Sequence, residues 1–415
     1  MTMQSALGLV IFLFLAWCLS ERRRTVAWRM IVSGLALQFL VAALMLKVPF
    51  FRQILLWLNA LVAALEEATR AGTSFVFGYL GGGVLPFAES RSGASFILAF
   101  QTLPLVILIA ALTSLLFYWR ILPLAVRFFS LVLRRTMGIG GALGVGTAGT
   151  IFLGMVEAPL LIKPYLARMT RSELFALMSV GLACIAGTML AIYASLLREA
   201  VPDSTGQILT ASVIHAPAAL LLAALLVPET GAPTLGHELP KSEASGSMDA
   251  LCRGTWDGLT LFLNIVAMLI VFVALVKLVN LGLGLFPDVL GAPATLERLL
   301  GFILAPAAWL TGVPWSESAA AGSLLGTKVA LNELIAYIDM TRLPAGALSA
   351  KSRLIMAYVM CSFSNLGSVG ILVAGLGTLC PERRAEIVSL SMKALLAGVM
   401  ASLMTGAVIG VLDPY

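Results

Sequence analysis

Two acidic residues interrupt long apolar stretches of the sequence. Glu157 lies in GMVEAPLLIKPY, and Glu333 lies in KVALNELIAY beside Asn332. An unpaired ionisable residue in an apolar membrane helix costs roughly 2.5–3.5 kcal/mol on insertion scales, so its presence points to a function. A carboxylate can accept hydrogen bonds from both vicinal hydroxyls of a sugar, and an amide can donate and accept. Asn365 and Ser368, in CSFSNLGSVG, add an amide and a hydroxyl. Together these groups predict a site for a polar, uncharged solute.

The same residues allow other interpretations. Glu157 and Glu333 would form simple ion pairs with Lys163 and Lys328, and the amide and hydroxyl would bond neighbouring backbone in a bundle joined by polar contacts. His215, in an apolar stretch, is either a proton relay or a hydrogen-bonded packing residue. An intramembrane enzyme would use the two carboxylates as an acid–base pair, for example to cleave a glycosidic bond. The sequence holds neither HExxH nor GxxxxGK[ST], so we expect no enzyme, and uphill transport would need an ion gradient.

The composition places these groups in a membrane. Of 415 residues, 60% are hydrophobic and 12% are charged, and the mean hydropathy is +1.00. Soluble proteins carry about 25% charged residues, so this chain has too little polar surface to cover a soluble core. We attribute the net charge of +6 to topology, and we expect no nucleic-acid partner, because no basic stripe with aromatics occurs. The five cysteines form no CxxC or Cys/His cluster, so no metal or other cofactor is expected.

Long apolar blocks predict an all-α polytopic membrane protein with eight transmembrane helices, since about 20 helical residues cross a bilayer. The blocks are residues 5–19, 27–46, 99–118, 174–197, 208–227, 259–279, 354–376 and 387–412. Two further stretches, 137–161 and 299–338, are interrupted by Gly, Pro and ionisable residues. This favours two opposed re-entrant hairpins over ordinary spans with tight glycine packing. The amphipathic segment 50–70 is predicted to lie along a membrane interface.

Positive charges and a repeated pattern predict orientation and domains. The basic run at 22–24 places the first loop in the cytoplasm and both chain ends outside, although the basic residues between 342 and 353 depart from the rule. Gly-Thr pairs at 149–150 and 326–327 precede the two glutamates, and hairpin, span and span follow in both halves, as in inverted repeats. The predicted domains are N-terminal spans and an interfacial helix forming a scaffold (1–98), a first repeat (99–228, hairpin near 137–165), a cytoplasmic linker (229–254) and a second repeat (255–415, hairpin near 297–339).

Five strings, in order along the chain, resemble the concentrative nucleoside transporters: GMVEAPLLIKPY, MTRSELFALM, GVPWSES, GTKVALNELIAY and CSFSNLGSVGIL. The resemblance covers essentially the whole chain. It implies an elevator-type symporter, a homotrimer in a bacterial inner membrane, with a nucleoside as substrate. It also implies that Glu333, Asn365 and Ser368 bind ribose hydroxyls, that Glu157 is the carboxylate of the first hairpin, and that Phe363 packs near the substrate.

The first hairpin departs from the family pattern Gly-Gln-Thr/Ser-Glu, because it reads Gly154-Met155-Val156-Glu157. Met155 and Val156 cannot make the side-chain hydrogen bonds that Gln and Thr make to the nucleobase. Base recognition would then be more apolar and rely on Glu157, Met189 and water, which favours a purine nucleoside, a modified nucleoside such as pseudouridine, or a non-nucleoside solute. The predicted substrate-binding residues are Gly154, Met155, Val156, Glu157, Met189, Asn332, Glu333, Phe363, Asn365 and Ser368.

The ion site implied by the resemblance also differs. Sodium-coupled members use Asn and Ser side chains with backbone carbonyls, and the matching residues here are Thr150, Leu153, Cys184 and Ile185. Sodium is a hard cation that prefers oxygen ligands, and a thiol is a poor substitute. We therefore expect proton coupling ahead of sodium coupling, with facilitated diffusion as a third alternative. A carboxylate in a dry hairpin, that of Glu157 or Glu333, would carry the proton.

Overall fold

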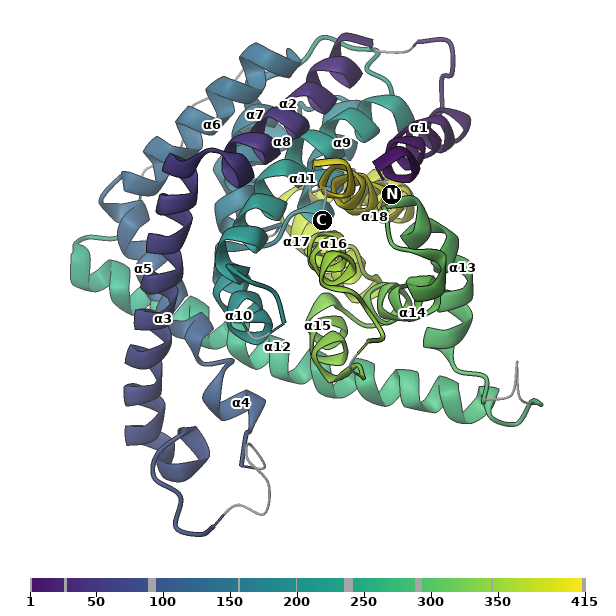
Figure 1. Cartoon of the computed structure of the whole chain (residues 1–415). Helices are drawn as coiled ribbons and strands as arrows, with labels where there is room; N and C mark the ends of the chain where they lie inside the picture. Colours follow the sequence, from purple (N-terminus) through teal and green to yellow (C-terminus); the bar gives the residue numbers. More distant parts are fainter. Residues whose placement is uncertain are drawn as a thin grey trace.

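The computed structural model describes residues 2–25, 28–88, 95–155, 157–198, 200–234, 242–287, 293–344 and 346–412. Every regular element in these ranges is a helix, as Figure 1 shows. The expected all-α architecture is therefore confirmed.

The N-terminal part consists of long helices followed by short ones. They are α1 (Thr2–Cys18), α2 (Trp28–Lys47), α3 (Pro49–Phe77), the 3-10 helix η1 (Gly78–Gly81), α4 (Leu98–Gln101) and α5 (Leu105–Tyr118). Pro49 opens α3 after Val48 in an extended conformation, which suits proline because the first helical N–H has no partner in the helix. This helix covers the amphipathic segment expected at 50–70 and continues beyond it to Phe77.

The first half of the core contains a hairpin between two helical layers. Its elements are α6 (Ile121–Met137), α7 (Gly141–Leu153), η2 (Ala158–Ile162), α8 (Lys163–Leu166), α9 (Arg171–Ala183), α10 (Gly187–Leu197) and α11 (Ser204–Leu226). The chain reverses after α7 at Gly154, whose φ of +96° is unfavourable for residues with a side chain. A Cβ at this position would also stand 2.8 Å from the Cβ of Ala186, so glycine lets the apex approach the start of α10.

The second half repeats this order of elements. It contains α12 (Ser247–Leu283), α13 (Leu296–Leu310), α14 (Trp315–Ala330), α15 (Glu333–Arg342), α16 (Ala350–Met360), α17 (Leu366–Leu379), η3 (Pro381–Arg383) and α18 (Arg384–Leu412). Helices α14 and α15 form the second hairpin, with its apex at residues 331–332, so the hairpin expected near 297–339 begins at Trp315, and α13 is a separate helix before it. Helix α12 begins at Ser247, inside the stretch that we interpreted as a linker.

Two expected spans are broken helices. The stretch 174–197 divides into α9 and α10 at residues 184–186, and the stretch 354–376 divides into α16 and α17 at residues 361–365. The expectation of one continuous helix in each was wrong. At the second break Asn365 caps α17, because its side chain accepts a hydrogen bond from the backbone N–H of Ser368. Breaks of this kind are tolerated at membrane depth only where protein or a cavity surrounds them.

Five helical stretches of the described chain are long and apolar enough to cross a membrane: Trp28–Lys47, Leu98–Tyr118, Ser204–Leu226, Ser247–Leu283 and Pro381–Leu412. Two of these, which contain α11 and α18, are almost entirely buried and form the centre of the molecule (Figure 1). By contrast, α12 packs along α5 at the edge and exposes many large apolar side chains. This distribution is typical of a membrane protein, whose outer surface contacts lipid.

Candidate functional site

The side chain of Glu333 is the centre of a buried polar cluster. Glu333 is the first residue of α15, directly after Asn332, whose side chain accepts a hydrogen bond of 2.9 Å from the N–H of Ile335. Only 4% of Glu333 is exposed. Tyr193 of α10 donates its hydroxyl to Oε1 at 2.5 Å, and Asn365 donates its amide to Oε2 at 3.0 Å. Three helices thus fix the carboxylate, and the helix N-terminus favours its negative charge.

Asn365 has two structural roles at once. Its Oδ1 accepts a hydrogen bond of 2.7 Å from the N–H of Ser368, while its Nδ2 donates to Glu333. These two contacts fix the orientation of the amide. The hydroxyl of Ser368 makes no hydrogen bond to any residue that the structure describes, although only 6% of the residue is exposed. The predicted group Glu333, Asn365 and Ser368 is therefore brought together, with hydrogen-bonding capacity to spare.

The first hairpin contributes an apolar surface. Met155, 7% exposed, lies against Gly181 of α9, where a built Cβ would stand 3.1 Å from the Met155 Cβ. Glu157 is exposed, and its carboxylate turns back toward Gly154. The dry environment expected for a proton-carrying carboxylate is thus found at Glu333 and not at Glu157. Val156, the fourth predicted residue of this apex, lies outside the described residues.

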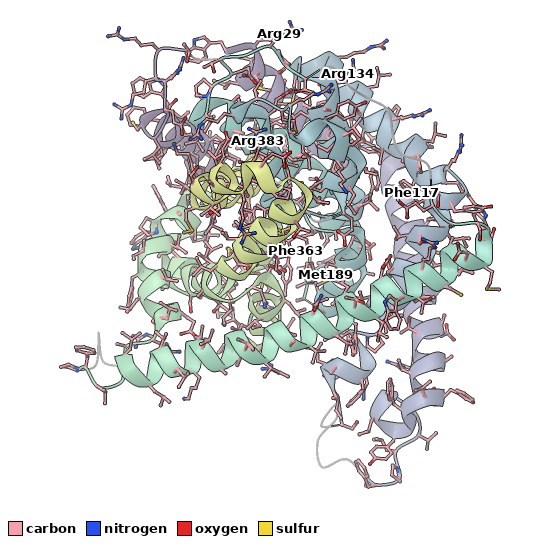
Figure 2. All side chains as sticks on the ribbon, turned by 180° about the vertical axis from the view of Figure 1, so that it is seen from behind. Arg29, Phe117, Arg134, Met189, Phe363 and Arg383 are labelled. Atoms are coloured by element: carbon pink, nitrogen blue, oxygen red, sulfur yellow. The ribbon has the colours of Figure 1, made fainter. Side chains whose placement is uncertain are left out.

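Two further predicted residues lie in the middle of the molecule. Figure 2 shows Met189 and Phe363 in the interior, away from the basic end marked by Arg29, Arg134 and Arg383. Met189 is buried in the first turn of α10, and Phe363 is half-buried in the break between α16 and α17. Both offer apolar and polarizable surface, which suits the face of a planar ring.

The residues of the predicted ion site meet where the first hairpin reaches the break between α9 and α10. The carbonyl oxygen of Phe152 approaches Gly187 so closely that a Cβ there would stand 2.8 Å from it. Thr150 and Cys184 are buried, and each side chain has a backbone carbonyl as partner. The Thr150 hydroxyl donates to the carbonyl of Gly146 at 2.8 Å, and the Cys184 sulfur lies 3.6 Å from the carbonyl of Ser212.

Two other expected ligands, Leu153 and Ile185, carry no polar side-chain atom. Leu153 is half-buried and Ile185 is buried. Each would offer an ion only its backbone carbonyl. The Thr150 hydroxyl, which donates its hydrogen to a carbonyl, keeps lone pairs that could contact an ion, whereas the Cys184 thiol offers sulfur, a poor ligand for a hard cation.

Tyr193 is the residue of this cluster that the sequence did not reveal. It is fully buried, and its ring centroid lies 5.2 Å from that of Tyr337. A buried tyrosine hydroxyl normally has a hydrogen-bond partner. The presence of a tyrosine within the apolar run TMLAIYASLL could therefore have indicated a polar contact. Tyr337 donates its own hydroxyl to the carbonyl of Ala357 at 2.7 Å, and so does not compete for Glu333.

Lys328 has partners other than Glu333, and His215 is buried with a hydrogen-bonded ring, as in the packing alternative. The fully buried Lys328 directs its ammonium to the carbonyl of Val359 at 3.4 Å and the Ser402 hydroxyl at 3.3 Å. No ion pair between described residues joins it to Glu333. His215 is buried in α11, where Nδ1 faces the carbonyl of Ala211 in the same helix. Its Nε2 has no partner within the described ranges.

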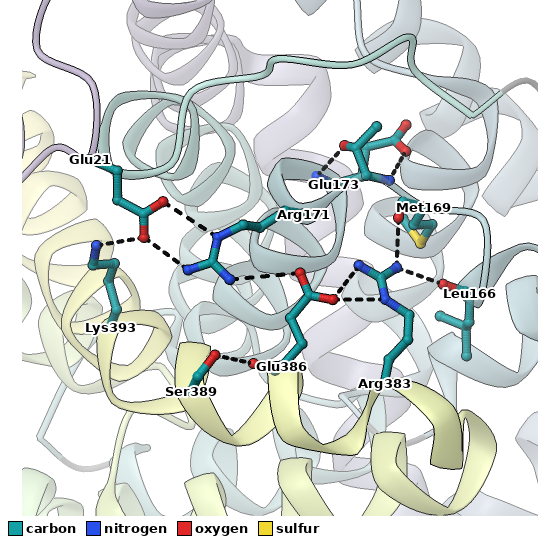
Figure 3. Close-up of polar contacts among 10 residues, drawn as sticks. Glu21, Leu166, Met169, Arg171, Glu173, Arg383, Glu386, Ser389 and Lys393 are labelled. Carbon is teal, nitrogen blue, oxygen red and sulfur yellow. Dashed lines mark hydrogen bonds and ion pairs between the residues drawn. The ribbon is translucent and has the colours of Figure 1, made fainter.

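An ionic network fixes the basic end of both repeats. Figure 3 shows Arg171 between Glu21 and Glu386, at 3.1 and 3.7 Å, with Lys393 also on Glu21 at 3.0 Å. Burial raises the pKa of Glu21, but the hydrogen bonds from Arg171 and Lys393 outweigh it and hold this pKa below its usual value. Arg383 adds hydrogen bonds to the carbonyls that end the first hairpin, those of Leu166 and Met169. The network ties the start of α9 to the start of α18.

Comparison with known proteins extends over nearly the whole chain. "Na+ dependent nucleoside transporter N-terminus" matches residues 7–80, "Nucleoside recognition" matches 99–200, and "Na+ dependent nucleoside transporter C-terminus" matches 207–410. The nucleoside permease NupC of Helicobacter pylori (strain ATCC 700392 / 26695) is 34% identical over 98% of this chain and 96% of its own length.

Two solved structures show the same fold in different states. CNTnw in an inward-facing substrate-bound state is 34% identical, with a TM-score of 0.90 over 99% of this chain and 98% of the other. A variant of CNTnw in an outward-facing state is 33% identical, with a TM-score of 0.90 over 99% and 97% of the two chains. The overall fold is thus shared with a protein that has been observed open to either side.

Proposed function

The chain belongs to the concentrative nucleoside transporter family, as its sequence motifs predict, and on that premise we propose that it imports nucleosides by binding their ribose at Glu333. It is a multi-pass membrane transporter and not an enzyme. The observation that carries the proposal is the buried Glu333 carboxylate, fixed by Tyr193 and Asn365. Each of its oxygens accepts one hydrogen bond and has a lone pair left for a hydroxyl of the solute.

In the proposed complex, the protonated carboxyl of Glu333 donates to one ribose hydroxyl and accepts from the other, and the free hydroxyl of Ser368 and the amide of Asn365 complete the polar side. A solute without these hydroxyls leaves buried polar groups unpaired, at about 1–3 kcal/mol for each. Asn332 acts through its cap on α15, which fixes the direction of Glu333.

The base would lie against Met155, Met189 and Phe363, with Gly154, Val156 and Glu157 around the apex. Met155 and Val156 supply no hydrogen bonds to a pyrimidine, so we propose a purine nucleoside or a modified nucleoside such as pseudouridine as the preferred substrate. Met155→Gln combined with Val156→Thr should raise competition by ordinary pyrimidine nucleosides in an uptake assay. Unchanged selectivity would contradict the proposed base contacts, and a non-nucleoside solute is the alternative.

We propose a proton as the coupling ion, carried by Glu333. One observation supports this: the buried thiol of Cys184 stands at a position where a hard cation would prefer an oxygen ligand. Glu333 is buried and lies in the solute site, so a solute and a proton would act on the same carboxylate. Sodium is the alternative, since the family matched here is described as Na+ dependent.

For the transport movement, we propose that the two hairpins move as an elevator against a scaffold, in a homotrimer of the bacterial inner membrane with both chain ends outside. The edge helices α5 and α12 are our choice for the scaffold, together with α3. Helix α1 packs against α18, so we assign α1 to the moving part and narrow the scaffold expected at 1–98.

The test is uptake of labelled uridine, adenosine and pseudouridine into proteoliposomes, under a pH gradient and separately under a sodium gradient. We expect uptake that depends on the pH gradient and is unaffected by sodium. Uptake under sodium alone would refute proton coupling and leave nucleoside transport intact. Absence of uptake for all three nucleosides, with correctly folded protein, would refute the nucleoside proposal.

A further inference from the structure

Helix α6 is apolar on two opposite faces. One face is buried against the core through Leu122, Val126, Leu133 and Met137. The other face is exposed, and its large apolar residues recur at helical spacing: Ile121, Leu124, Phe128 and Leu131. A helix that exposes an apolar stripe next to basic residues is typical of a membrane surface.

The C-terminal end of α6 carries arginines around a cavity. A cavity of about 320 Å³ is lined by Leu131, Arg134, Arg135, Gly138 and Ile139. Arg29, from the start of α2, belongs to the same cluster, because its guanidinium carbon lies 3.9 Å from a Cβ built at Gly138. Figure 2 shows Arg29 and Arg134 at the same end of the molecule.

These three arginines differ from the basic residues of the ionic network. Arg171, Arg383 and Lys393 each bind a carboxylate in the network of Figure 3. No acidic side chain of the described ranges pairs with Arg29, Arg134 or Arg135. Three guanidinium groups beside one cavity therefore lack an anion, and a planar guanidinium binds a phosphate through two parallel hydrogen bonds.

We propose that this cavity binds the phosphate headgroup of an anionic phospholipid, with Arg134 and Arg135 on the phosphate and Arg29 completing the charge. The exposed apolar face of α6 would pack along the acyl chains, and this is why we commit to a lipid and not to a soluble phosphate. Basic pockets between helices at the cytoplasmic surface are known to favour such headgroups. The proposal is independent of the transported solute.

The cavity lies at the base of the first hairpin, so a bound lipid would affect how this hairpin is held. Helix α6 ends at Met137, and α7, the first arm of the hairpin, begins at Gly141. A headgroup held at Arg134 and Arg135 would thus anchor the base of the first hairpin to the membrane surface, on the side opposite to its apex at Gly154.

The test compares lipids on the purified full-length protein in detergent. Native mass spectrometry would count bound phosphatidylglycerol and phosphatidylcholine of identical acyl chains, with inorganic phosphate as competitor. The variants are Arg134→Gln with Arg135→Gln, and the matched control is Arg22→Gln with Arg24→Gln, which removes the same charge from an exposed loop. A basic residue near an anionic surface contributes about five-fold in affinity, so the cavity variant should lose roughly 25-fold and the control less than two-fold.

Equal retention of the two lipids by the wild-type protein would overturn the proposal. So would an equal loss in both variants, which would indicate diffuse charge attraction. Displacement of the lipid by inorganic phosphate at similar concentration would assign the cavity to a soluble anion. Arg134→Lys with Arg135→Lys keeps the charge and removes the bidentate geometry; it should fall between wild type and the glutamine variant, and its unfolding temperature without lipid checks folding.

Discussion

Replacing Tyr193 with phenylalanine removes one hydroxyl from the proposed site and leaves the ring in place. The ring keeps its contact with Tyr337, whose centroid lies 5.2 Å away, so packing should be preserved. The hydroxyl lost is the one that donates to Oε1 of Glu333, while Asn365 still holds Oε2. Tyr193→Phe is therefore a test of whether the carboxylate must be fixed before the solute arrives.

Two separate effects follow, with different sizes. A hydrogen bond to a charged group contributes about 1.5–3 kcal/mol, and this should appear mainly as a lower free energy of unfolding. The freed carboxylate must then be immobilised by the solute, at about 0.5–1.5 kcal/mol for one side chain, which corresponds to roughly two- to twelve-fold weaker binding of a riboside. A solute that does not use the carboxylate should be unaffected.

The assay is equilibrium binding of adenosine and 2′,3′-dideoxyadenosine to the purified protein, with thermal unfolding measured in parallel. In Tyr193→Phe, we expect the riboside to lose affinity and the dideoxynucleoside to keep it, so that the ratio of their affinities falls toward one. The matched control is Tyr337→Phe, which loses a bond to the backbone of Ala357 but no contact with Glu333. An unchanged affinity ratio, or an equal fall of this ratio in the control, would refute the positioning role of Tyr193.

Two further changes test the solute and ion positions, and a third tests the ionic network at the basic end. Glu333→Gln should weaken adenosine binding by about ten-fold or more with little loss for the dideoxynucleoside, and wild-type affinity would remove this residue from the site. Thr150→Asn with Cys184→Ser restores oxygen ligands, so uptake should become dependent on a sodium gradient; continued indifference to sodium would contradict our account of the ion position. The lowered pKa of Glu21 means that its bond to Arg171 stabilises the fold fully above about pH 4.5 and is lost as the pH falls through the lowered value. Glu21→Gln should therefore reduce the unfolding temperature at pH 7 by more than at pH 3, and an equal reduction at both would refute the linkage.

The sequence predicted those parts of the site whose residues are unusual in an apolar helix. Glu333 and Asn365 stand out because a carboxylate and an amide are costly there, and the structure brings them within hydrogen-bonding distance. Tyr193 does not stand out, because an aromatic residue in an apolar run is ordinary. Its role depends on the approach of α10 to α15, which is a tertiary contact between residues 140 positions apart.

The sequence did not predict the helix breaks, because these also depend on tertiary contacts. The stretch around Cys184, Ile185 and Ala186 is as apolar as its surroundings, so hydropathy alone gives one continuous span. The break exists where the carbonyl of Phe152 and the apex at Gly154 press against it, which no local pattern encodes. At the other break, Asn365 and Ser368 were predicted as binding residues, but the cap that Asn365 forms at the start of α17 was not predicted.

We propose that a few side chains, and not the fold, determine the coupling ion. The structure places the apex of the first hairpin against the break between α9 and α10, and the fold is shared at a TM-score of 0.90 with CNTnw. That backbone supplies carbonyl groups whatever the side chains are. Side chains add to these carbonyls, and here the Cys184 position adds a thiol, whose sulfur lies 3.6 Å from the carbonyl of Ser212 in α11 and suits a hard cation poorly. Because Glu333 is the buried carboxylate in direct reach of the proposed solute, a change of ion needs no change of architecture: the energy of the gradient would act on the same group that holds the ribose.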